Sequence, residues 1–282
     1  RYIKSNSQSP CRLLFVAHRE EILRQSLKCF RGVLHDGNFG ELFVGGCKPS
    51  SLDNLFVSVQ TLNSRSLTDI TTPDYYDFII VDEFHHASAP TYQKLLEYYK
   101  PKILLGLTAT PERMDGKDIL DYFDGRIAAE IRLPEAIDRK LLCPFQYFGV
   151  SDNVDLSDLK WSRGGYDRTA LSNVYTGNDL RTFQILDSVR KYVTDINTVI
   201  GIGFCVSKAH AEYMAMRFSE NKIPSASLTS DSGDDVRKSV QKQLVNGEIK
   251  FVFTVDLYNE GVDIPEINTI LFLRPTESLT VF

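Results

Sequence analysis

The sequence of 282 residues lacks the features that mark membrane-spanning, exported or zinc-binding chains. No uninterrupted apolar run approaches the roughly 20 residues of a membrane span, and no signal-peptide pattern of basic start, apolar stretch and small cleavage site is present. No CxxC pair exists, so a zinc site of the usual spacing is not expected. We interpret the five widely spaced cysteines as reduced core thiols of a cytoplasmic protein: Cys11, Cys29, Cys47, Cys143 and Cys205.

An excess of positive charge is also missing. Lys and Arg number 32 and Asp and Glu 37, which gives a net charge of −5. A chain that binds nucleic acid as a uniformly cationic surface would be basic, so any such contact here must be local. Hydrophobic residues make up 43% and charged residues 24%, which is typical of globular domains and argues against disordered, collagen-like and coiled-coil classes.

Short apolar runs alternate with longer stretches of helical spacing, and this alternation predicts parallel sheets with crossover helices. The expected strands are 13–17, 55–59, 78–81, 103–107, 199–204, 251–253 and 270–273. The expected helices are 19–30, 91–99, 180–193, 207–221 and a segment that carries Val236, Val240 and Leu244 and ends near Gly247. Together with the length, the pattern predicts two α/β domains, 1–147 and 148–282, with a non-periodic insertion at 151–180.

The most informative site is Val81-Asp82-Glu83-Phe84-His85-His86, which directly follows the apolar run 78–81. Parallel sheets place their chemistry at the carboxyl ends of strands. An Asp there can hold a Mg²⁺ that is bound to nucleotide phosphates, and a Glu beside it can orient or deprotonate the attacking water. His85 is then placed to couple that site to its surroundings. If Asp82-Glu83 is considered without its neighbours, the alternative interpretation is an ordinary acidic turn after a strand.

The same residues also allow a different class of protein, a metal hydrolase. Asp82, Glu83, His85 and His86 could ligate a hydrolytic metal. However, the HExxH pattern is absent, and adjacent histidines point in different directions. With only five histidines in the chain, a His-rich centre has few further donors, so this reading is a minor alternative.

Two further motifs follow apolar runs. In Thr108-Ala109-Thr110, two hydroxyls flank a small residue and can bond to the neighbouring acidic motif. The third motif is Thr254-Val255-Asp256 with Glu260 to Pro265, in which Gly261 permits close backbone approach to a ligand. Each has an ordinary structural reading, because threonines often satisfy local backbone groups and Gly/Asp turns are frequent.

In this order and spacing, the motifs resemble those of superfamily 2 helicases of the DEAD/DEAH-box type. Asp82-Glu83-Phe84-His85 is similar to motif II, Thr108-Ala109-Thr110 to motif III, and 254–265 to motif V. Segments 16–19, 57–62 and 204–207 resemble motifs Ia, Ib and IV. Residues 82–87 with 108–113 are most similar to the helicase subunits of bacterial type III restriction enzymes, the Res proteins.

The resemblance implies two RecA-like domains with mostly parallel sheets, with ATP bound between them and single-stranded nucleic acid across both. It implies that Asp82 holds Mg²⁺ and that Glu83 activates water. It also assigns three further sets of roles. These are coupling for His85, Thr108 and Thr110; nucleotide binding for Gly261 and Asp263; and nucleic-acid binding for Arg19, Gln60, Thr61, Ser207 and Thr254. A few such contacts to the backbone of the nucleic acid are compatible with a net charge of −5.

Two departures from the family pattern stand out. The phosphate-binding loop, G-x-x-x-x-G-K-S/T, is absent, and so is motif VI with its arginine fingers. We therefore expect a core trimmed at both ends, whose first sheet lacks the P-loop strand. That strand is expected beside strand 78–81, so a gap, a rearranged edge or a reduced sheet should result. An arginine finger contributes ~10³–10⁵ in rate, so the isolated fragment is expected to be inactive.

The expected function is therefore that of an ATP-dependent helicase or translocase in the full-length protein, with DNA, single- or double-stranded, favoured over RNA. A link to restriction or repair and an attached nuclease domain or subunit are compatible with the resemblance. The alternative is a non-catalytic binding or scaffold module that keeps the helicase fold. The intact Asp82-Glu83 pair argues against that alternative, because a dead site has no need of a water-activating Glu.

Overall fold

A computed structural model describes residues 11–109, 119–152, 154–159, 161–162, 165–255, 257 and 264–275. The chain divides into two compact units, Arg1–Arg139 and Lys140–Phe282, so this division falls before the predicted boundary at 147. In the second unit, the ring of Phe148 stacks on that of Tyr192 with centroids 4.2 Å apart. Among the described residues, no helix is long and apolar enough to cross a membrane.

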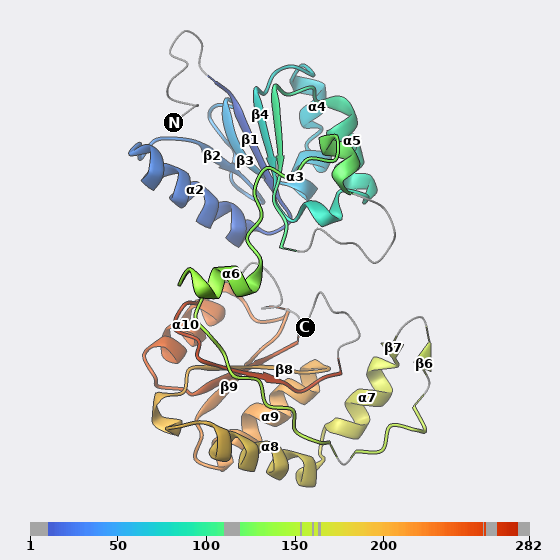
Figure 1. The fold of residues 1–282 in the computed structure, drawn as a ribbon, viewed down its shortest axis with the longest axis vertical. Coiled ribbons are helices and arrows are strands. Elements are labelled where there is room, and N and C mark those ends of the chain that lie inside the picture. The colour runs from blue at the N-terminus through green and yellow to red at the C-terminus, as the bar shows by residue number, and fades with distance from the viewer. Residues whose placement is uncertain are drawn as a thin grey trace. The chain divides into compact units, whose positions relative to one another are not determined.

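The first unit is built on a five-stranded parallel sheet with the order β2-β3-β1-β4-β5 (Figure 1). The strands are β1 (Leu13–Ala17), β2 (Glu41–Phe43), β3 (Asn54–Ser58), β4 (Phe78–Val81) and β5 (Ile103–Gly106). The α-helices are α2 (Glu20–Leu34), α3 (Val59–Ser64), α4 (Leu67–Ile70), α5 (Pro90–Tyr98) and α6 (Leu133–Asp138). Two 3₁₀ turns are η1 (Phe84–His86) and η2 (Ile119–Phe123).

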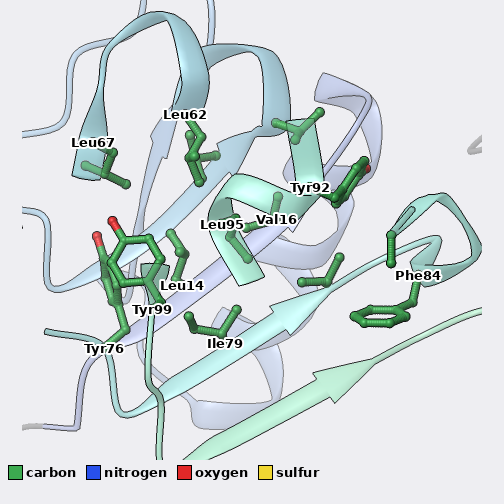
Figure 2. Packing of buried hydrophobic residues seen from close by; sticks show 14 of the residues in the cluster. Leu14, Val16, Leu62, Leu67, Tyr76, Ile79, Phe84, Tyr92, Leu95 and Tyr99 are labelled. Carbon is green, nitrogen blue, oxygen red and sulfur yellow. The ribbon is translucent and has the colours of Figure 1, made fainter. Parts of the chain in front are cut away.

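Both faces of this sheet are covered, as the continuous apolar runs predict. Because side chains alternate along a strand, Leu14 and Val16 of β1 face one layer and Leu13 and Phe15 face the other. The first layer contains α3, α4 and α5, whose Leu62, Leu67, Tyr92 and Leu95 pack on the sheet (Figure 2). The second layer is α2, which contributes Ile22, Leu23 and Leu27.

The strand that precedes the acidic motif is paired on both sides. β4 pairs in parallel with β1 and with β5, so of the three outcomes predicted for strand 78–81, a gap beside this strand is not found. β5 is the edge strand of the sheet, and its Ile103 and Leu105 are 43% and 37% exposed.

The second unit has a four-stranded parallel sheet with the order β11-β8-β10-β9. Its strands are β8 (Gly201–Phe204), β9 (Ser225–Leu228), β10 (Phe251–Thr254) and β11 (Thr269–Phe272). Helices α8 (Asp179–Tyr192) and α9 (Lys208–Glu220) pack on one face, and α10 (Asp234–Val245) packs on the other. A 3₁₀ turn, η3 (Ile196–Thr198), precedes β8. Together with the first unit, this confirms the predicted α/β class with mostly parallel sheets.

Two glycines of β8 make room for two aromatic rings of β10. Gly201 is in register with Phe251 and Gly203 with Phe253. A Cβ atom on either glycine would lie 2.3 Å or 2.4 Å from the ring of its partner. The Gly-Ile-Gly sequence thus has a packing role in the core of the second unit.

The insertion 151–180 contains regular structure that its sequence did not predict. A short hairpin, β6 (Trp161–Ser162) with β7 (Gly165–Tyr166), precedes helix α7 (Arg168–Tyr175). Asp167 caps α7 by accepting a hydrogen bond from the backbone N–H of Ala170 at 2.8 Å. α7 buries Leu171 and Tyr175 against Val206, so the insertion is docked on the second unit.

All five cysteines are free thiols, but the expectation that they lie in the core is wrong for most of them. Cys29, Cys47 and Cys143 are exposed and Cys11 is half-buried. Only Cys205 is buried, and burial raises the pKa of its thiol to about 12.

Candidate functional site

The carboxyl edge of the first sheet gathers most of the predicted site residues of that unit. β3, β1, β4 and β5 are parallel neighbours in that order, so the residues that follow them line one edge. In order along this edge they are Gln60 and Thr61; Arg19; Asp82, Glu83 and His85; and Thr108. Residues far apart in the sequence are thus brought into one row.

The backbone at the acidic pair is held in a tight and strained turn. The N–H of Asp82 donates to the carbonyl of Val16 at 2.9 Å, and the N–H of Glu83 donates to Oδ1 of Asp82 at 3.0 Å. Glu83 has φ 50° and ψ 51°, the left-handed region, which for a residue with a Cβ atom costs about 1–2 kcal/mol. Such strain persists only where the surroundings enforce it, and it concentrates at functional sites.

The residue that enforces this turn is Phe84. Its side chain is fully buried, and its N–H donates to the carbonyl of Leu107 at 2.8 Å (Figure 2). Its ring lies 4.8 Å from that of Phe123 and over Gly106, where a Cβ atom would be 2.7 Å from both rings. The Phe between the acidic residues and the histidines therefore acts as an anchor.

His85 connects the acidic pair to the end of β5. Its Nδ1 lies 3.1 Å from Oε2 of Glu83 and 3.2 Å from Oγ1 of Thr108, and the side chains of His85 and Glu83 are 18% and 20% exposed. A carboxylate only accepts, so the Glu83 contact requires a proton on Nδ1, whereas a bare Nδ1 accepts from the Thr108 hydroxyl. A bare Nδ1 therefore excludes the Glu83 carboxylate, whereas a protonated Nδ1 can donate to either partner.

The environment of Asp82 fits a cation. Burial raises the pKa of Asp82, while the Glu83 N–H, together with a positive charge on His18 or His85 where either is protonated, acts in the opposite direction. A partly desolvated carboxylate is stabilised by a bound cation, and Mg²⁺ takes oxygen ligands from one or two carboxylates plus substrate phosphates. Among the residues that the structure describes, no group of three or more His, Cys, Asp and Glu could hold a metal by itself.

The predicted nucleic-acid contacts of the first unit differ in accessibility. Gln60 is exposed at the start of α3, and Arg19 is half-buried with its Nε donating to Nε2 of His18 at 3.1 Å. The hydroxyl of Thr61 accepts from Oγ of Ser58 at 2.9 Å, and Ser58 caps α3. Thr61 is thus already part of a helix cap.

In the second unit, Ser207 caps α9 by accepting from the N–H of His210 at 3.1 Å, and its Oγ lies 2.6 Å from that of Ser172 in α7. Thr254, the last residue of β10, is fully buried, and its hydroxyl has no hydrogen-bond partner within the described part of the chain. Thr110, Gly261 and Asp263 lie outside the described residues.

Sequence reasoning placed His86 in the acidic motif but did not place His18 beside it. The ring of His18, which follows β1, lies 5.8 Å from that of His86, and the ring of His86 lies 4.1 Å from that of His85. The position of His18 in the sequence could have indicated that it lies at this edge, because His18 directly follows a buried strand, as Asp82 does. The contact itself depends on β1 and β4 being neighbours, which the sequence did not reveal.

Each unit has a parallel sheet covered by helices, with polar residues at the carboxyl edge of the first sheet, and this is the architecture of RecA-like domains. The chain matches solved structures of such proteins. One is Saccharomyces cerevisiae Dbp5 bound to RNA and ADP BeF3, at TM-score 0.58 and 12% identity over 93% of this chain and 62% of that one. Another is the Pyrococcus furiosus Hef helicase domain, at TM-score 0.50 and 14% identity over 95% and 82%. At these identities the likeness shows the fold alone.

Family models match both units. The model "Type III restriction enzyme, res subunit" matches residues 1–113, and "Helicase conserved C-terminal domain" matches 186–282. The chain belongs to the superfamily 2 helicases, in the group that includes the restriction-enzyme Res subunits.

Three curated relatives illustrate the breadth of this group. A 51.5 kDa protein of a Lactococcus phage is 30% identical over 96% of this chain and 54% of its own length. A Saccharomyces cerevisiae protein named as an ATP-dependent helicase, IRC3, is 28% identical over 94% and 39%. The type I restriction enzyme EcoAI endonuclease subunit of Escherichia coli is 26% identical over 74% and 29%. The chain thus spans about half, or less, of the length of these relatives.

Proposed function

We propose that this chain is the core of an ATP-dependent nucleic-acid translocase or helicase. The observation that carries the proposal is the row Asp82, Glu83, His85 and Thr108, held by side-chain contacts of 3.1 Å and 3.2 Å at the carboxyl edge of a parallel sheet. This arrangement combines a half-buried carboxylate that fits a cation with a second carboxylate that is oriented by a histidine.

In this function, Asp82 would hold Mg²⁺, which neutralises developing charge on the phosphates. Glu83 orients the attacking water and accepts its proton. When Glu83 takes the proton, its carboxylate loses the charge that attracts the Nδ1–H of His85, and the contact with Thr108 is favoured instead. His85 and Thr108 thereby register the state of Glu83, which is the coupling role proposed for them and for Thr110.

The remaining residue roles are proposals that rest on the family. Gly261 and Asp263 would approach the nucleotide from the second unit. Arg19, Gln60 and Thr61 would contact the backbone of the nucleic acid from the first unit, and Ser207 and Thr254 from the second. Because Thr254 is fully buried here, its contact requires a rearrangement at the end of β10.

DNA is the preferred partner in this proposal. The Res family model and the type I restriction enzyme subunit both belong to restriction enzymes, which act on DNA. RNA is the second choice, supported by the fold shared with the RNA-bound Dbp5 structure. A nuclease domain or subunit and a cytoplasmic location complete the proposal for the full-length protein.

The decisive experiment measures ATP hydrolysis by the full-length protein alone, with single-stranded DNA and with single-stranded RNA. We expect stimulation by DNA, and Glu83→Gln should abolish turnover while retaining nucleotide binding. Absence of ATP hydrolysis in the wild-type protein would refute the proposal in favour of a scaffold module. Stronger stimulation by RNA than by DNA would show that RNA is the preferred nucleic-acid partner.

The 282 residues by themselves should hydrolyse ATP only at background rate. They contain no G-x-x-x-x-G-K-S/T sequence to cradle the phosphates. DNA-stimulated hydrolysis by this chain alone, abolished by Glu83→Gln, would contradict this expectation. Comparison with the full-length protein, assayed in parallel, provides the control.

A further inference from the structure

Three of the five histidines of the chain lie in contact at the carboxyl edge of the first sheet. His18 follows β1, and His85 and His86 form part of η1 after β4. The rings of His18 and His86 meet edge to face, with centroids 5.8 Å apart and planes at 68°. The rings of His86 and His85 are 4.1 Å apart. These residues form a continuous row, which we call the histidine row.

The histidine row joins two predicted functional groups. At one end, Nε of Arg19 donates to Nε2 of His18 at 3.1 Å. At the other end, Nδ1 of His85 contacts Glu83 and Thr108. An unbroken set of contacts therefore runs from a predicted nucleic-acid contact to the predicted water-activating carboxylate.

We propose that His18 and His86 are positioning residues that transmit nucleic-acid engagement at Arg19 to Glu83. This inference rests on the proposed function. It concerns two residues to which neither the sequence motifs nor the comparisons gave a coupling role.

The Arg19 end acts as the sensor because the guanidinium only donates hydrogen bonds. His18 must present a bare Nε2 to Arg19, so this bond fixes both the tautomer and the orientation of the His18 ring. A phosphate group is a stronger acceptor than imidazole and binds Arg in a bidentate way. When Arg19 turns to a phosphate, His18 loses this hydrogen bond, and the orientation of its ring changes.

The other end acts through the backbone of Glu83. The N–H of His86 donates to the carbonyl of Glu83 at 2.9 Å, and the carbonyl of His86 accepts from the N–H of Ala89 at 2.9 Å. His86 is thus tied directly to the residue whose left-handed conformation sets the direction of the carboxylate. A rotation of the His18 ring changes the edge-to-face contact of His86 and biases the η1 turn.

Matched substitutions separate the two contacts of His18. His18→Phe keeps a ring against His86 and removes the acceptor for Arg19. His18→Gln places an oxygen where Nε2 lies and removes the ring. For His86, Phe keeps the ring contacts and Leu removes them. The control is His35→Asn, because His35 ends α2 with φ 52° and Asn tolerates this conformation.

The experiment is performed on the full-length protein, with ATP turnover measured without DNA and with saturating oligo-dT. We expect H18F, H18Q and H86L each to reduce the stimulation ratio about tenfold, within the range known for substitutions that weaken coupling. Basal turnover should stay within about twofold, and H86F and the control H35N should retain the wild-type ratio.

The outcomes distinguish this inference from the proposed function. An unchanged ratio in H18F, H18Q and H86L, with Glu83→Gln inactive, would overturn the histidine row and leave the proposed function standing. Equal losses of basal and stimulated turnover would also overturn it, because they indicate a structural role only. A wild-type protein without ATP turnover would overturn both.

Discussion

Acidification should destabilise the second unit through a single buried histidine. His210 in α9 is fully buried, and burial lowers its pKa to about 3, with the charge of Arg181 acting in the same direction. Its Nδ1 accepts from the N–H of Val206 at 3.3 Å, and its ring lies 5.7 Å from that of Tyr175. The neutral imidazole is therefore the form that the fold accommodates.

The sign of the effect follows from proton uptake. In the unfolded chain His210 takes up a proton near the ordinary pKa of about 6.5, whereas in the folded chain it stays neutral down to a pKa of about 3. Within this window the unfolded state binds more protons, so the free energy of unfolding falls as the pH falls. Below pH 6.5 the free energy of unfolding falls by about 1.4 kcal/mol per pH unit. Lowering the pH from 7 to 5 therefore reduces the free energy of unfolding by about 2 kcal/mol.

The assay compares the wild-type chain with His210→Gln. A Gln at this third helical position can reach back and accept a backbone N–H at the start of the helix, that of Ser207 in a capping box, and it takes up no proton. Urea unfolding of the second unit is followed by hydrogen exchange of α9 peptides at pH 7 and pH 5, and the difference between the two proteins removes the contributions of all other groups. We expect wild-type to lose about 2 kcal/mol more than H210Q. A difference below about 0.5 kcal/mol, which is the limit of additivity, would refute the reasoning.

Three substitutions and one control substitution test other parts of the structure by urea unfolding. Gly106→Ala should destabilise the first unit by about 1–3 kcal/mol, and lower turnover as well, because its Cβ would lie 2.7 Å from the Phe84 ring. Gly32→Ala, in open space on α2, is the matched control and should be neutral or stabilising. Thr254→Val should stabilise the second unit by about 1 kcal/mol, because it removes a buried hydroxyl. A loss of stability would show instead that this hydroxyl is bonded. Ser207→Ala should lose about 1 kcal/mol with the cap of α9, and no change would contradict the capping role.

Continuous apolar runs made several strands predictable. β1 and β4 have the predicted bounds, and β10 is one residue longer than predicted, because strands buried on both faces need apolar residues throughout. β9 was missed because Ser225–Leu228 has a single large apolar residue. α7 was missed because its apolar positions are few and its burial depends on contacts with Val206, which is distant in sequence.

The candidate site was predictable to the extent that it depends on strand ends. Asp82, Glu83, His85 and Thr108 follow apolar runs, and the parallel sheet brings them together. Sheet order was not predictable from the runs, so the position of β4 between β1 and β5 and the contact of His18 with His86 were not foreseen. The burial of side chains at strand ends could not be predicted from the sequence either, and the fully buried Thr254 is an example.

The two Gly–Phe pairs of β8 and β10 also act as a register lock. A slip of β10 by two residues along β8 keeps the same faces but leaves one Phe opposite a residue larger than glycine, Val199 or Cys205. A slip by one residue turns the rings to the opposite face of the sheet. Only one alignment seats both rings, so the pairs exclude competing strand alignments during folding. Natural variants at positions 201 and 251, or 203 and 253, are therefore expected to change in pairs, with a smaller ring wherever glycine is lost.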